Sequence, residues 1–231
     1  MRLVIWNRGE FVMYVRAQIK DFPRLKKKLE DMKEAPKKVL ESTFNDAKKR
    51  VPSWVAAEVS KVYGIKKAEI GNGEAGQVKV RGNSLDDLTI IYSGRMLSPS
   101  HFGMTPKAPG ANAYTLKAEI IRGQRVTLGK VKKLSKEQRA ELGKNFRREG
   151  TRNSNRSPIM LMHTGNQKAS GTDYIPFQRK STDRKDIEAV KSISLPQMVS
   201  SERAAPGIRK AISEGLEKRL DHNMERYMGK I

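Results

Sequence analysis

The sequence predicts an α+β protein in which an antiparallel, curved sheet of about four to six strands packs against N-terminal helices and a long C-terminal helix. Three segments alternate apolar and polar side chains as strands do, namely Gln77–Arg81, Leu88–Tyr92 and Tyr114–Ile121. A Gly82-Asn83 turn between the first two makes them an antiparallel pair. Segments with apolar residues at helical spacing lie on both sides of this strand-rich region.

The N-terminus begins with a short apolar run, Met1–Trp6, which is too brief for a signal peptide. We expect residues 1–13 to form an arm, a β-strand that adds to the sheet of a neighbouring subunit. Residues 14–231 are expected to form a single domain with a basic excursion at 122–156. The alternation in Tyr14–Ile19 predicts the first strand of this domain.

Helical periodicity follows the first strand and continues to Tyr63-Gly64. Pro36 and Pro52 are expected to divide it into pieces, because proline removes a backbone donor and clashes with the preceding turn. A linker is expected at Ile65–Ile70. Further along, Pro158–Gly165 and Tyr174–Lys180 are predicted to be strands.

The last helix is expected to start after Ser200 or Ser201 and to end at Met228. Its apolar residues recur at every fourth position, so one stripe winds slowly around the helix. Ordinary core packing explains such a stripe, and contact with another subunit is the alternative. The candidate subunit-interface residues are Ile208, Ile212, Leu216, Leu220, Met224 and Met228.

The charge of the chain is strongly positive, with 47 Lys and Arg against 25 Asp and Glu, or +22. Such a charge attracts polyanions, although a solvated basic surface is an alternative. The stretch Arg122–Arg156 holds twelve basic and three acidic residues. Its candidate contacts to nucleic acid or to an acidic partner are Arg122, Arg125, Lys130, Lys132, Lys133, Arg139, Lys144, Arg147, Arg148, Arg152 and Arg156.

Sequence-specific recognition of nucleic acid is not predicted, because no groove-reading motif is found. Aromatic residues make up only 6% of the chain, too few for a platform that stacks bases. The charge therefore predicts at most salt-sensitive contacts to the nucleic-acid backbone.

No catalytic constellation stands out in the sequence. The chain has no cysteine, and His101, His163 and His222 lack the spacing of metal ligands. Asp86-Asp87 is best explained by a turn. A dinucleotide site requires a glycine-rich string that opens a helix, whereas Gly71–Gly76 precedes a strand. We expect no enzyme activity, no cofactor and no metal. No apolar run approaches the roughly 20 residues of a membrane-spanning helix, and no membrane partner is expected.

Several local strings, in this order, resemble the minor tail protein Z family of phages and prophages. They are Val62–Lys67, Gly94–Phe102, Pro158–His163, Pro176–Arg179 and Ser194–Met198. The resemblance covers the chain from about Tyr14 to Met228, while the N-terminal arm and the long basic excursion depart from the pattern.

Members of this family look like tail-completion proteins at the head-proximal end of the tail. The resemblance implies a structural virion protein of the neck, assembled in the host cytoplasm as a ring of six copies. Its implied partners are the tail terminator, the tail tube, the head connector and DNA in the channel. A free cytosolic protein that binds nucleic acid without sequence preference is the alternative.

Overall fold

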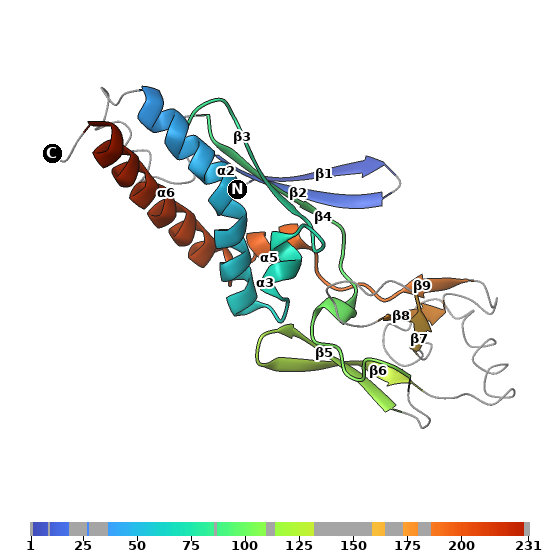
Figure 1. Ribbon diagram of the computed structural model, residues 1–231. Helices are drawn as coiled ribbons and strands as arrows, with labels where there is room; N and C mark the ends of the chain where they lie inside the picture. The colour runs from blue at the N-terminus through green and yellow to red at the C-terminus, as the bar shows by residue number, and fades with distance from the viewer. Residues whose placement is uncertain are drawn as a thin grey trace, which may run out of the picture. The chain divides into compact units, whose positions relative to one another are not determined.

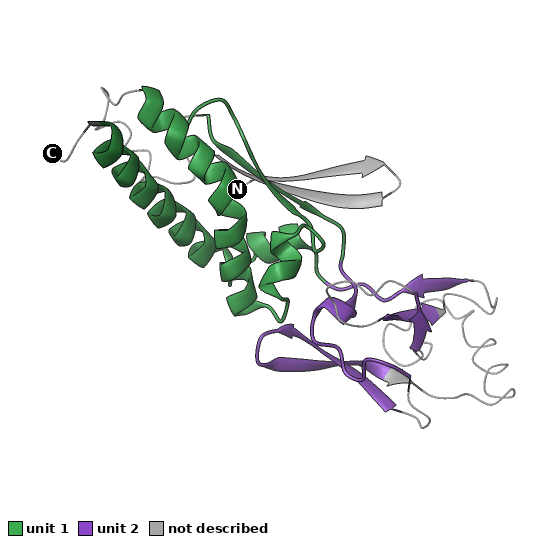
Figure 2. Ribbon diagram, viewed as in Figure 1, with its two compact units in different colours: residues 1–96, 193–231 green, residues 97–192 purple. Residues whose placement is uncertain are grey.

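The computed structural model describes residues 2–8, 10–18, 27, 37–85, 87–109, 114–131, 159–164, 173–179 and 186–228. These residues form helices and antiparallel sheets, which confirms the α+β class. The described strands are divided among three sheets of four, two and three strands, so two of the sheets are smaller than expected. The chain groups into two compact units, Met1–Met96 with Ile193–Ile231 and Leu97–Ser192 (Figure 2).

The sheet of the first unit has the order β1-β2-β4-β3. Its strands are β1 (Arg2–Arg8), β2 (Glu10–Gln18), β3 (Gln77–Arg81) and β4 (Thr89–Gly94). The strand predicted at Tyr14–Ile19 is the second half of β2. Residues of the expected arm form β1 and the start of β2, and these two strands pair within the chain, with Arg2 opposite Arg16.

The pairing of β3 with β4 sets which residues face the core. Val78 lies opposite Tyr92 and Val80 opposite Ile90, and directly opposed residues share one face of a sheet. Ile90 and Tyr92 are fully buried, so this face is the inner one. Lys79, opposite Ile91, is on the other face and is exposed.

Helix α2 (Lys37–Val62) is continuous through Pro52, so the break predicted there is wrong. Val51 and Val55 are completely buried on either side of the proline, and this packing outweighs the loss of one backbone hydrogen bond. The short helix α3 (Lys67–Gly71) occupies most of the predicted linker. Within the described residues, no helix combines the length and apolar character needed to cross a membrane.

Two helices complete the first unit, α5 (Leu195–Ser200) and α6 (Ala205–Met228). Ser194 and Gln197 form a capping box at the start of α5, in which each side chain bonds to the other's backbone N–H. Helix α5 packs against β4 and β2, and α6 lies along α2 (Figure 1). The predicted terminal helix is thus confirmed.

The described residues of the second unit form the 3₁₀ turn η2 (Pro99–His101) and five strands. These are β5 (Tyr114–Ile121), β6 (Gln124–Val131), β7 (Met160–His163), β8 (Tyr174–Arg179) and β9 (Ile187–Ala189). β5 pairs with β6, and the other three form a sheet in the order β7-β8-β9. Residues 124–131 of the predicted basic excursion are therefore strand β6, paired antiparallel with β5.

Candidate functional site

The tip of the β5–β6 hairpin carries the first two predicted contact residues, Arg122 and Arg125. Ile121 pairs with Gln124, which leaves Arg122 and Gly123 as the turn. Gly123 has a φ of +79°, a left-handed conformation that glycine adopts without steric cost. Its N–H donates to Oε1 of Glu119 at 2.9 Å, which fixes the turn against β5.

The charges at this tip are open to solvent. The Nε of Arg125 lies 4.0 Å from Oε2 of Glu119, and the arginine side chain is 59% exposed. An exposed ion pair of this length is worth little, so Arg125 can exchange Glu119 for another anion at low cost. Arg122 is exposed as well. The tip can therefore present two cations to one polyanion.

The rest of the predicted basic set extends from the other end of β6. Lys130 lies on β6, opposite Thr115 of β5. The other predicted contacts lie outside the described residues: Lys132, Lys133, Arg139, Lys144, Arg147, Arg148, Arg152 and Arg156.

Residues on either side of the basic segment pack into the same small core. Met104, Leu116 and Ile159 are buried together, with Leu128 and Leu161 packed against them. Gly129 of β6 permits this contact, because a Cβ there would lie only 2.9 Å from Cδ1 of Ile159. Tyr114 borders the same core, and burial raises the pKa of its hydroxyl. Leu128 of β6 and Ile159 thus pack into the same core.

Most of the candidate interface residues on α6 are buried in the core of the first unit. Ile208, Ile212, Leu216 and Leu220 are each at most 1% exposed. They have no surface left for another copy, which favours ordinary core packing over the alternative of contact with another subunit. Of the other two, Met224 is half-buried, and the side chain of Met228 lies outside the described part of the chain.

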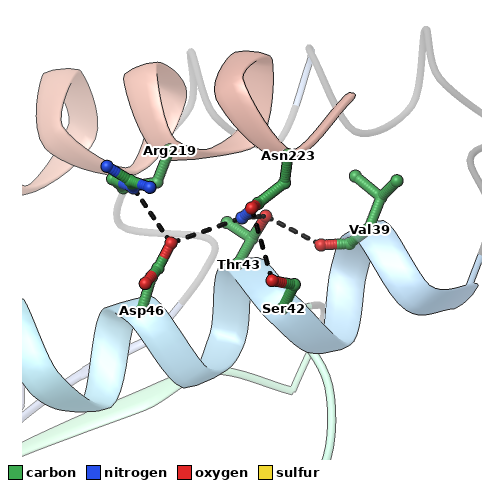
Figure 3. A network of polar contacts seen from close by, with 6 residues as sticks. All are labelled: Val39, Ser42, Thr43, Asp46, Arg219 and Asn223. Carbon is green, nitrogen blue, oxygen red and sulfur yellow. Dashed lines mark hydrogen bonds and ion pairs between the residues drawn. The ribbon is translucent and has the colours of Figure 1, made fainter. Parts of the chain in front are cut away.

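A polar network joins α2 to α6 near the C-terminal end of α6 (Figure 3). Asn223 is 1% exposed, and its Nδ2 donates to Oγ1 of Thr43 at 3.1 Å and to Oδ2 of Asp46 at 3.4 Å. The hydroxyl of Ser42 donates to Oδ1 of Asn223, and Nε of Arg219 donates to Oδ2 of Asp46 at 2.9 Å. Each polar group of Asn223 thus has a partner that only one register of the two helices supplies.

The network also sets the protonation of Asp46. Burial alone would raise the pKa of this carboxyl, but hydrogen bonds from Arg219 and Asn223 oppose it, together with the charges of Arg219 and Arg50. The net effect is a pKa below the usual value, so the carboxylate is charged at neutral pH. These hydrogen bonds and the ion pair therefore stabilise the packing of α6 against α2.

Close contact between the two helices depends on Gly215. A Cβ at this position would lie 2.6–2.8 Å from three ring carbons of Trp54 on α2. Glycine therefore lets the indole ring lie against the backbone of α6.

The three histidines lie on three different elements. His101 lies in η2, His163 at the end of β7 and His222 on the exposed side of α6. His163 stacks edge-on against Tyr174, with ring centroids 5.3 Å apart. No cluster of three or more metal-ligating side chains occurs within the described ranges.

A further basic site lies on the first unit and was not predicted from the sequence. A groove of about 560 Å³ is lined by Lys48 of α2 and by residues Val78, Lys79, Val80, Arg81, Gly82 and Asn83. The string Val78-Lys-Val-Arg81 indicates that Lys79 and Arg81 share a face. No local pattern connects them with Lys48, which is about thirty residues earlier in the chain.

Comparisons with known proteins add no relative to these observations. No protein-family model, no curated protein and no solved structure matches the chain.

Proposed function

We propose that the protein is a structural component of a phage or prophage tail, a tail-completion protein that forms a ring at the head-proximal end and joins the tail to the head connector. The observation that carries the proposal is the order of sequence strings that resembles minor tail protein Z. Two of these strings contain β7 and part of β8, and a third contains the cap and first turns of α5.

The basic segment supplies a further argument for a neck location. The neck channel holds the end of a packaged genome, and cations that face it can contact phosphates without reading bases. Arg122 and Arg125 are exposed at a hairpin tip, and β6, which leads from this tip into the basic segment, packs through Leu128 against a small core. We propose that this hairpin and segment face DNA in the channel.

Purified particles test the structural role. The chain should co-sediment with tails and complete particles, and labelled antibody should locate it where tail meets head. A chain that is found only in the soluble fraction, as a monomer or dimer, would overturn the proposal.

The DNA contact is tested by reversing two charges, Arg122→Glu with Arg125→Glu. Each phosphate contact contributes roughly 0.9 to the slope of log affinity against log salt, so the slope should fall by about 2. The matched control is Arg209→Glu with Lys218→Glu, two exposed cations of α6, which should leave the slope unchanged. Equal slopes for all three proteins would show that the hairpin does not contact DNA.

A free nucleic-acid-binding protein is the second candidate, and the net charge of +22 favours it. It predicts the same salt dependence but no ring and no association with particles. Sedimentation of the particles therefore separates the two candidates where DNA binding does not.

A further inference from the structure

Strand β3 combines three features: a groove along it, positive charge, and an edge that pairs with no other strand among the described residues. β3 is the last strand of the four-stranded sheet among the described residues, and the groove follows it from Val78 to Asn83. An edge strand presents backbone N–H and C=O groups that can pair with another strand. The groove, which is lined by Lys48 of α2 as well as by β3, provides space for such a strand.

The side chains along this edge define the chemistry of a partner. Lys79 and Arg81 are exposed on the outer face, while Val78 and Val80 are half-buried on the inner face. Lys48 is the third cation of the groove, and none of the described residues that line it is acidic. A strand beside β3 would therefore meet cations at alternate positions on one face and valines on the other.

We propose that β3 binds an extended, acidic peptide segment of a partner protein, which adds to the sheet as a further strand. Glutamate or aspartate at every second position of the partner would lie beside Lys79 and Arg81. Small apolar residues between them would contact Val78 and Val80. Main-chain pairing supplies affinity in this mode of binding, and the alternating side chains supply selectivity.

A peptide explains the site better than nucleic acid does. The edge of a strand offers carbonyl oxygens as well as N–H groups, and a peptide backbone satisfies both kinds. A phosphate backbone only accepts hydrogen bonds, so it would leave the carbonyls unpaired. The proposal goes beyond the role in the tail and does not depend on it, because isolated protein and synthetic peptides test it.

The probe is a fluorescent peptide in which glutamates alternate with valines, titrated with full-length protein. One control peptide has the same composition with its glutamates grouped together, and a second is N-methylated at alternate residues to block main-chain pairing. The alternating peptide should bind, and both controls should bind about tenfold more weakly or not at all.

Charge exchange locates the site on β3. Lys79→Glu with Arg81→Glu should lose the glutamate peptide and gain a peptide in which lysines alternate with valines. The control Arg209→Glu with Lys218→Glu removes equal charge from α6 and should bind the glutamate peptide as wild type does. A gain of binding cannot come from a misfolded variant.

Three outcomes would overturn the proposal. The first is no binding of the alternating peptide, and the second is equal binding of the grouped or N-methylated peptide, which would indicate charge alone. The third is displacement of the alternating peptide by a single-stranded oligonucleotide whose own binding requires Lys79 and Arg81. In that case the groove is a nucleic-acid site.

Discussion

Leu216→Ala tests whether the stripe on α6 belongs to the core of one chain. Leu216 is completely buried, and so are Ile212 and Leu220, one turn away on either side. The substitution removes three carbon atoms, which at about 0.8 kcal/mol per buried group gives about 2.4 kcal/mol. The cavity that remains raises the expected loss to roughly 3–4 kcal/mol. For a chain of this length, Tm should fall by about 5–15 °C.

Circular dichroism during thermal and urea unfolding, at protein concentrations that differ by a factor of one hundred, measures this loss. A core residue predicts the same loss at every concentration, because folding of one chain does not depend on mass action. Lys218→Ala, an exposed position of the same helix, should change stability by less than about 0.5 kcal/mol. A Leu216→Ala protein with wild-type stability at low concentration, but with impaired association, would refute the assignment to the core.

Two further predictions concern the contact between α2 and α6. Gly215→Ala should destabilise the fold by about 1 kcal/mol, because overpacking against Trp54 (about 1–3 kcal/mol) exceeds the gain in helix propensity (about 1 kcal/mol). A Cβ at Gly207 would meet only the flexible carboxylate of Glu58, at 3.1 Å, so Gly207→Ala should be neutral or stabilising. Equal stabilities of the two variants in urea would contradict the predicted clash at Gly215. Asp46 has a lowered pKa, so its stabilising contribution is present above the unfolded pKa near 3.8 and is lost as pH falls through the folded pKa. Acid titrations should accordingly show a steeper loss of stability in wild type than in Asp46→Asn, and parallel curves would exclude this role.

Periodicity predicted the helices and strands whose pattern of apolar residues lies entirely within their own segment. The apolar stripe of α6 and the alternation in β3 and β5 appear at the expected residues, because each pattern is local. The break expected at Pro52 did not occur, because burial of Val51 and Val55 depends on helices and strands far away in the sequence. The capping box of Ser194 and Gln197 was readable in the sequence, and it would have predicted α5.

The functional surfaces were less predictable than the helices. The alternation of Val126 and Leu128 marks β6, yet the density of positive charge led to the prediction of an excursion there. The stripe on α6 could be assigned to the core only once α2 was seen beside it. The groove at β3 depends on a long-range contact between α2 and β3, which no spacing in the sequence encodes.

Native mass spectrometry of the purified full-length chain, with electron microscopy of the same sample, tests the ring most directly. The tail-completion role predicts a closed ring with six times the 26.1 kDa mass of the chain, free of nucleic acid after a high-salt wash. A monomer or dimer at every concentration, whose only assemblies form on added DNA and dissolve in salt, would contradict it and favour the free nucleic-acid-binding protein.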